Sequence, residues 1–150
     1  MIFLEINPEL KLSLPPDLLE RAAQAVLAHQ SIAADADLTL VLTSDEQIQA
    51  LNRDFLGRNA PTDVLSFPAD ETDPQTGRRY LGDVVISISR AESQARAGGH
   101  TLEAELQLLV VHGVLHLLDH DHAGAEDKAR MWAAKAEVLE RLGLAGIKIL

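Results

Sequence analysis

The chain contains no cysteine, and this absence limits the chemistry that it can use. Without thiols there is neither a disulfide framework nor a thiolate metal site. A transition-metal site would have to be built from histidine and carboxylate side chains. The sequence holds six histidines, so the search for metal ligands begins with them.

The chain also lacks an excess of positive charge. It carries 13 Lys and Arg against 23 Asp and Glu, a formal net charge of -10 at pH 7. Proteins that bind nucleic acid by broad neutralisation of phosphates show a basic face instead. We therefore expect no DNA partner, whereas an RNA substrate held by a local patch stays compatible with this charge. The main physical consequence of the acidity is solubility.

No uncharged apolar run in the sequence reaches the length that spans a membrane. Residues 1–7 have neither the basic region nor the long apolar stretch of a secretory signal. We expect a cytoplasmic protein without a membrane partner. Internal repeats and low-complexity segments are absent too, and 150 residues with 47% hydrophobic content suit one domain over 1–150.

The hydrophobic pattern predicts four strands and five helices. Strand signals cover residues 2–6, 38–43, 64–67 and 80–88. Helical patterns cover residues 17–30, 45–56, 89–97, 102–118 and 126–142. Pro68 is expected to stop the third strand, and the polar stretch 69–79 to form an exposed, mobile loop. This order suggests a mixed four-stranded sheet covered by helices.

Two details of the helices follow from their sequences. Thr43-Ser44-Asp45-Glu46 resembles a capping box that opens the second helix, which carries Ile48, Leu51 and Phe55 on one face. Thr101 is suited to cap the fourth helix. Residues 106–118 of that helix are apolar nearly all round, so we expect it to be central and buried.

The fourth helix also carries the candidate chemistry. His112 and His116 are four residues apart, so their side chains lie on one face, roughly 6 Å apart along the axis. His122 follows a run, 119–121, that favours a break in the helix and a turn back toward the pair. Three imidazoles leave a fourth position open on the ion, as in catalytic zinc sites. We predict that these three residues bind one divalent ion and that this ion is Zn²⁺.

The alternative is that these histidines are satisfied core or cap residues. Four of the six histidines fall between positions 112 and 122. Two of them face an apolar surface, where an unpaired imidazole costs free energy. The clustering therefore favours metal ligation, whereas His29 and His100 are expected to be solvated caps without a role.

The spacing H-x3-H-x5-H also matches the ligands of metzincin peptidases. Gly113 stands where those enzymes have the glutamate that activates water, so a peptidase of that mechanism is not expected. Two explanations of Gly113 remain open. Either a neighbouring element packs too closely for a Cβ atom, or substrate has to reach the metal across that spot.

Three segments resemble the bacterial rRNA maturation factor family known as YbeY. Residues 112–122, H-G-V-L-H-L-L-D-H-D-H, are similar to its H-G-x-L-H-L-x-G-Y-D-H signature. Residues 61–68, P-T-D-V-L-S-F-P, match its P-T-D-V-L-S-F-P strand, and residues 81–87, L-G-D-V-V-I-S, resemble its L-G-D-I-x-I-S strand. The resemblance covers about residues 38 to 143.

The resemblance implies a single-strand-specific endoribonuclease that trims the 3′ end of 16S rRNA and serves ribosome quality control, with zinc on the three histidines. It implies rRNA precursor and the small ribosomal subunit as partners. The fold that it implies is α+β, a single domain with a mixed four-stranded sheet covered by about five helices and the metal site on the central buried helix.

The chain departs from the family pattern in two places. Asp119 and His120 replace the Gly and Tyr before the last ligand, so His120 is a possible competitor of His122 for the metal. Leu56 replaces the basic residue of the pattern L-N-R-x-Y-R-G-K-D. Arg58 is the nearest candidate for the catalytic contact to phosphate, or else a solvated loop charge.

Three further residues receive roles by hypothesis. Asp121 is expected to orient a ligand histidine from outside the ligand set. Asp63 and Ser66 are expected to line the substrate cleft, although Asp63 also suits a strand-end cap. The rival function is a ribosome-assembly binding protein whose metal only stabilises the fold. Cleavage of RNA that is lost on metal removal while folding persists would separate the two.

Overall fold

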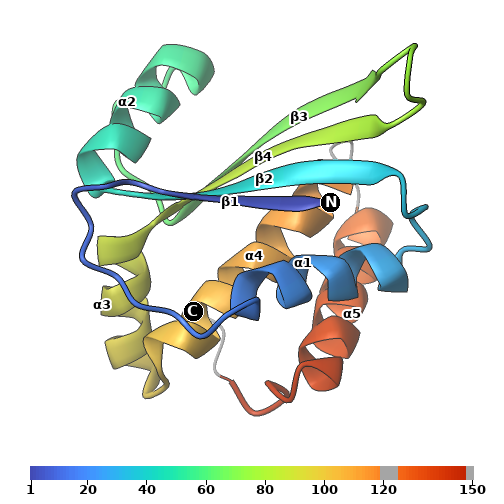
Figure 1. The fold of residues 1–150 in the computed structure, drawn as a ribbon. Coiled ribbons are helices and arrows are strands. Elements are labelled where there is room, and N and C mark those ends of the chain that lie inside the picture. Colours follow the sequence, from blue (N-terminus) through green and yellow to red (C-terminus); the bar gives the residue numbers. More distant parts are fainter. Residues whose placement is uncertain (119–124, 148–150) are drawn as a thin grey trace.

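The computed structural model describes residues 1–118 and 125–147, and that part of the chain forms four strands and five helices. Figure 1 shows their arrangement. In chain order they are β1 (Ile2–Ile6), α1 (Leu18–His29), β2 (Ala36–Thr43), α2 (Asp45–Leu56), β3 (Val64–Thr72), β4 (Arg79–Ser87), α3 (Ile88–Gly98), α4 (Leu102–Leu118) and α5 (Ala125–Arg141). The strands form one sheet in the order β1-β2-β4-β3, in which β3 alone is antiparallel to its neighbour. The predicted α+β fold with a mixed four-stranded sheet and five helices is confirmed.

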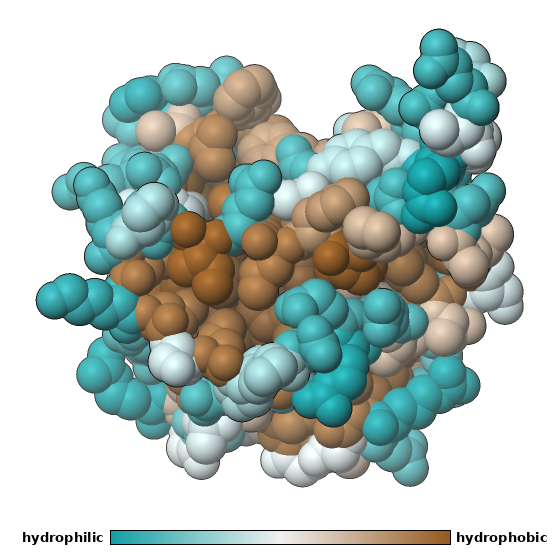
Figure 2. Space-filling model, in the orientation of Figure 1, coloured by the Kyte–Doolittle hydropathy of each residue, from teal (hydrophilic) through white to brown (hydrophobic). Residues whose placement is uncertain are grey.

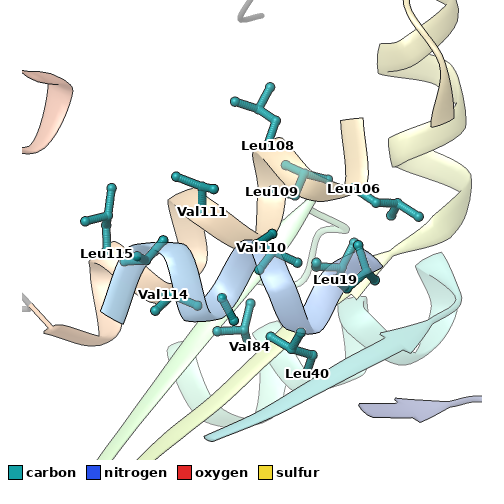
Figure 3. Packing of buried hydrophobic residues seen from close by; sticks show 14 of the residues in the cluster. Leu19, Leu40, Val84, Leu106, Leu108, Leu109, Val110, Val111, Val114 and Leu115 are labelled. Carbon is teal, nitrogen blue, oxygen red and sulfur yellow. The ribbon is translucent and has the colours of Figure 1, made fainter. Parts of the chain in front are cut away.

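The main core lies between one face of the sheet and four helices. Alternate residues of β2, Leu38, Leu40 and Leu42, are fully buried on this face. They face α1 and α4, whose apolar side chains interlock with the sheet (Figure 3). The alternation seen in the sequence is the period of a strand with one face on the core.

Helix α4 is the central element of that core, as its sequence predicts. Ten of its seventeen residues are buried, and Figure 3 shows its leucines and valines in one cluster with Leu19 of α1 and Val84 of β4. Burial accounts for its apolar composition. Among the described residues, no single helix is long and apolar enough to cross a membrane, and α3 with α4 meets that test only as a pair bent by 114°.

Helix α2 covers the other face of the sheet (Figure 1). Its Ile48 packs with Leu65 and Val85 in a second, smaller core. Phe55, predicted on the same helix face, contacts the ring of Phe67 with ring centroids 5.7 Å apart, and Phe67 packs against this smaller core. The predicted face is therefore correct, although Phe55 itself is 68% exposed.

The strand that contains Pro68 does not stop there, so the predicted loop 69–79 is wrong in extent. β3 continues to Thr72 and pairs with β4, with an irregular register between Pro68 and Glu71. Proline is tolerated because β3 is an edge strand whose outer side needs no amide donor. Gly82 lies opposite with φ +136, and a Cβ atom there would collide with the carbonyl of Phe67. Only residues 73–78 remain between the strands, and Figure 2 shows this hairpin tip as a hydrophilic projection.

Side chains cap the helices near the predicted positions. The N-cap of α2 is Ser44, whose Oγ accepts from the amide of Gln47, so the capping pair lies one residue later than the sequence reading from Thr43 to Glu46. Thr101 caps α4 as predicted, since its Oγ1 accepts from the amide of Ala104 at 3.1 Å.

Candidate metal centre

His112 and His116 lie on successive turns of α4, at the boundary between its buried and exposed sides. Their ring centroids are 4.4 Å apart and the ring planes are inclined by 62°. Both side chains are half-buried, whereas the residues around them on α4 are buried. The structure thus brings two of the three predicted ligands into a pair whose nitrogens can reach one ion.

Gly113, between the two histidines, lies where α4 approaches the sheet most closely. A Cβ atom there would collide with Cγ1 of Val84 and lie 3.2 Å from Cγ2 of Val64. The hydroxyl of Ser66 donates to the carbonyl of Gly113 at 2.9 Å. Close packing, the first explanation left open by the sequence, therefore accounts for this glycine. It also fixes α4 against β3 and β4, and with it the direction of both histidines.

Lys135 of α5 is the neighbour of His112 that the sequence reasoning missed. Its Nζ atom lies 3.2 Å from Nδ1 of His112, and the residue is only 7% exposed. Burial lowers the pKa of Lys135 below its ordinary value, while the charges of Asp63 and Glu105 oppose that change. A signal was present in the sequence, because Lys135 falls on the apolar stripe of α5 with Met131 and Val138.

A cavity of about 60 Å³ adjoins His112 and Lys135. Asp63, Gln94 and Glu105 line it too, and two leucines of α4 complete the wall. Polar residues from three helices and from the start of β3 therefore line one small cavity.

Asp63 caps the start of β3, the alternative considered for it, and it also lines the small cavity, whereas its role toward a substrate stays a prediction. Its Oδ1 accepts from the amide of Val64 at 2.8 Å and so caps the start of β3. Its Oδ2 accepts from Nε2 of Gln94 at 3.3 Å, and the residue lines the cavity beside His112. Ser66 is not among the residues that line this cavity, and its hydroxyl ties β3 to α4.

The expectation that His29 and His100 are solvated caps is wrong. Nε2 of His100 lies 2.8 Å from Oε1 of Glu105, a carboxylate that is 1% exposed. Nε2 of His29 lies 2.5 Å from Oε2 of Glu137, which joins α1 to α5. Both histidines are held by carboxylates that come from outside their own helix or turn, which sequence spacing does not reveal.

Leu56 and Arg58 lie at the end of α2, beyond the sheet face that α2 covers. Leu56 is 53% exposed, and Arg58 is exposed after Gly57, which turns the chain with φ +71. The backbone amide of Arg58 donates to the carbonyl of Asn52, which closes the end of the helix. A cationic side chain at either position would project into solvent rather than into the main core.

His122, the third predicted ligand, lies outside the described residues, as do His120 and Asp121. Within 1–118 and 125–147, His, Asp and Glu side chains form no group of three that could hold a metal ion. The described part of the site is therefore the pair on α4 with its surroundings.

Comparison with known proteins gives the family. The model of a family described as endoribonuclease YbeY matches residues 7–143. The chain belongs to the endoribonuclease YbeY family. A protein named endoribonuclease YbeY from Pelotomaculum thermopropionicum is 48% identical over 130 residues, which cover 85% of this chain and 86% of that protein. One from Chloroflexus aurantiacus is 42% identical over 147 residues, 94% of this chain and 96% of that protein.

A solved structure agrees with the fold of this YbeY family member. It is the solution structure of a protein from Thermotoga maritima, 27% identical, with a TM-score of 0.58. The match covers 95% of this chain and 92% of that one. Since the family model spans all the elements from α1 to α5, the predicted resemblance over residues 38 to 143 is confirmed and extended toward the N-terminus.

Proposed function

We propose that this protein is a zinc-dependent endoribonuclease that cuts single-stranded RNA and acts in 16S rRNA 3′-end maturation and ribosome quality control. Its substrate would be rRNA precursor, its larger partner the small ribosomal subunit, and its place the cytoplasm. The observation that carries the proposal is the pair of imidazoles, 4.4 Å apart on α4, in a chain that the endoribonuclease YbeY model matches over residues 7–143.

The residues of the site suit the proposed ion. The chain has no thiol, and His112 and His116 offer imidazole nitrogens, which zinc accepts readily. His112 and His116 would hold the ion from successive turns, with His122 as the third ligand. A divalent ion in such a site supplies Lewis acidity, which polarises a phosphoryl oxygen or lowers the pKa of water.

The remaining residues are proposed to hold the substrate and the ligands. Asp121 would orient one of the ligand histidines through a hydrogen bond. Asp63 would face the substrate from the start of β3, with Ser66 behind it on the same strand. Arg58 is the cation proposed for contact with a phosphate, because Leu56 offers none. Electrostatic stabilisation of the phosphate during cleavage is thereby assigned to one exposed arginine and the ion.

A cleavage assay on the full chain tests this function. The zinc-loaded protein should cut a labelled single-stranded RNA internally, and it should leave a duplex RNA and a DNA of the same sequence intact. Treatment with a chelator should abolish cleavage, and added zinc should restore it. Circular dichroism on the same samples should show that the chelated protein stays folded.

The rival function, a ribosome-assembly binding protein whose metal only stabilises the fold, predicts a different result. Leu56 favours this rival, because it stands at the end of α2 where the family pattern has a basic residue. In that case the zinc-loaded chain would bind RNA or the small subunit without cutting, and the chelator would unfold it. Cleavage by a folded, zinc-loaded sample would contradict the rival.

A further inference from the structure

Trp132 is the one tryptophan of the chain, and it lies on the surface of α5. It is 61% exposed, although proteins usually cover most of the large apolar surface of an indole. In the described part of the chain, the other exposed large apolar residues belong to the N-terminus, β1 and the end of α2: Met1, Phe3, Ile6, Phe55 and Leu56. Trp132 differs from them in its place, because α5 packs against α4, the helix of the histidine pair (Figure 1).

The contacts of Lys135 show how close the indole lies to the metal centre. Nζ of Lys135 is 5.6 Å from the centroid of the Trp132 ring and 3.2 Å from Nδ1 of His112. The centre of the indole and Nδ1 of His112 are therefore no farther apart than these two distances together. Successive phosphates of a stacked nucleic-acid strand are about 3.4 Å apart along the axis. A base within a few nucleotides of a phosphate at the centre is thus in reach of the Trp132 ring.

The segment around Trp132 is basic, although the chain is acidic. Residues 128–135 read K-A-R-M-W-A-A-K, with three cations and no acidic side chain, whereas the whole chain has a net charge of -10. Lys128 is exposed and lies four residues before Trp132, so the two side chains are neighbours on one face of α5. Lys135, three residues after Trp132, is buried. Lys128 is therefore the cation of this face that can meet a phosphate in solvent.

An exposed aromatic ring beside a cation is the arrangement with which many proteins bind unpaired nucleic acid. A base of any identity can stack its π-face on the ring, while the cation contacts the backbone phosphate. Bases within a duplex are already stacked on each other and do not offer that face to a side chain. The pair on α5 therefore suits single-stranded RNA, which is the substrate class of the proposed function.

We propose that Trp132 and Lys128 form an RNA platform on α5. The indole stacks on an unpaired base of the RNA, and Lys128 contacts a phosphate beside that base. The platform rests on the proposed function, because it takes single-stranded RNA as the substrate at the metal centre. It gives the RNA a contact on the α4 side of the sheet, whereas Arg58 follows α2, which covers the other side.

The fluorescence of the parent chain tests the platform without any substitution. Since Trp132 is the one tryptophan, selective excitation reports on its surroundings alone. The zinc-loaded full chain is mixed with a single-stranded oligoadenylate RNA at fixed salt, and the emission is recorded on mixing, before cleavage. We expect the RNA to quench the emission and to protect the indole from quenching by acrylamide.

Two other polyanions serve as controls in the same experiment. A duplex RNA of the same length offers no unpaired base, and inorganic polyphosphate carries negative charge without any base. Neither should quench Trp132 or protect it from acrylamide. An equal effect of polyphosphate would assign the change to charge alone and would overturn the platform. Binding of the single-stranded RNA that leaves the emission of Trp132 unchanged would overturn it too.

Substitutions test the same contact through RNA affinity, measured by the fluorescence anisotropy of a labelled single-stranded RNA. Trp132→Ala should raise the Kd at least about fivefold, and Trp132→Phe should recover most of the affinity because it keeps a ring for stacking. Lys128→Ala should weaken binding and reduce the slope of log affinity against log salt by about one. Circular dichroism checks that each variant is folded.

Matched control variants come from other parts of the surface. Phe3→Ala removes an exposed aromatic ring of β1, and Lys11→Ala removes an exposed cation. Both should bind RNA as the parent does. An equal loss of affinity in Phe3→Ala and Trp132→Ala would contradict a stacking site at Trp132, as would a Trp132→Phe variant no better than Trp132→Ala.

The outcomes separate the platform from the proposed function. If the parent cuts RNA while the emission of Trp132 and the affinity of Trp132→Ala stay unchanged, the platform is wrong and the function stands. If RNA quenches Trp132 and Trp132→Ala binds it more weakly, but the zinc-loaded parent does not cut it, the platform stands and the cleavage function fails. A parent that binds no single-stranded RNA contradicts both.

Discussion

The direction of the two α4 histidines depends on the residue between them. Gly113 lets the helix lie against Val84 and Val64, and this close approach places His112 and His116 at the boundary of the core rather than inside it. The hydroxyl of Ser66 holds the same turn from β3. Single substitutions at this contact should therefore show which residues matter for metal binding and which matter for the packing of α4.

Loss of a ligand should remove the ion. We expect His112→Ala, His116→Ala and His122→Ala each to weaken zinc binding strongly, because a site with three protein ligands cannot spare one. His120→Ala should retain one zinc per chain. Metal content after dialysis, measured by mass spectrometry, checks this set. A larger loss from His120→Ala than from His122→Ala would show that the third ligand is assigned to the wrong residue.

Gly113→Ala should destabilise the fold. A Cβ atom collides with Val84, and such overpacking costs about 1–3 kcal/mol. The better helix propensity of alanine returns about 1 kcal/mol of that. The net loss in the free energy of unfolding, measured by urea denaturation, should be up to about 2 kcal/mol. Gly146→Ala, where no atom lies within 4 Å of the added Cβ, should change it little. Equal stability of the two variants would contradict the packing account of Gly113.

The sequence allowed the histidine pair to be predicted, because a spacing of four places two side chains on one helix face regardless of the rest of the fold. Lys135 and Glu105 could not be placed in the same way. Their meeting beside His112 depends on how α5 crosses α4, which residue spacing within one helix does not determine. The third ligand, His122, stays a prediction.

At the scale of single elements, the end of α2 departs from the family pattern at Leu56. Leu56 is 53% exposed and Arg58 follows the left-handed Gly57, so the two side chains leave the helix end in different directions. A residue two places along does not replace its neighbour on a helix. The basic residue of the family pattern is expected to contact phosphate. In this chain that contact is therefore either weaker or made by Arg58.

Leu56→Arg should raise RNA affinity or cleavage, because one charge-assisted contact to phosphate is worth roughly 1.5–3 kcal/mol. Arg58→Ala should then matter little. Rates for both variants on one single-stranded RNA at fixed salt decide the matter. If instead Arg58→Ala abolishes cleavage and Leu56→Arg has no effect, Arg58 has taken over the role. If neither variant differs from the parent and RNA is still cut, phosphate recognition lies elsewhere.

The starts of β2 and β4 are joined by an ion pair that should govern acid stability. Arg78 bonds both carboxylate oxygens of Asp37, with Nε at 2.9 Å and Nη2 at 2.5 Å. Arg78 first, and then the N-terminal amine, hold the pKa of Asp37 well below its ordinary value. A lowered pKa means that the stabilisation is present above about pH 4 and is lost as the pH falls toward the folded-state pKa.

Asp37→Asn should therefore lower the stability at pH 7 and make its decline below pH 4 shallower than in the parent. Thermal unfolding between pH 2 and pH 7 measures both effects. Asp54→Asn serves as a control at pH 7, since its pair with Arg53 is exposed and contributes little. Parallel pH curves for the parent and Asp37→Asn would show that the pair does not contribute.

The helices and strands could be predicted because their hydrophobic periods are local features of the sequence. The errors lie at the ends of elements, where contacts with neighbouring elements determine the last residue. Pro68 reads as a strand end, but on an edge strand its missing amide costs nothing, and β3 continues to Thr72. The N-cap of α2 is Ser44, one residue after the predicted Thr43. The sequence did not distinguish the two, because both Thr and Ser suit an N-cap.

For the whole molecule, the central question is how an acidic chain with a net charge of -10 serves a polyanionic substrate. In this account it does so locally, through one ion on α4 and a few residues around it, while the rest of the surface keeps the protein soluble. RNA affinity should accordingly depend on bound metal far more than on the overall charge.

One titration tests this claim most directly. The metal-free full chain is supplied with increasing zinc, and the initial rate of cleavage of one single-stranded RNA is measured at fixed salt, for the parent and for His116→Ala. We predict that the parent's rate rises to a plateau at one zinc per chain, and that His116→Ala stays folded but at background rate. Cleavage by the zinc-free parent, or an equal rate for His116→Ala, would contradict the account.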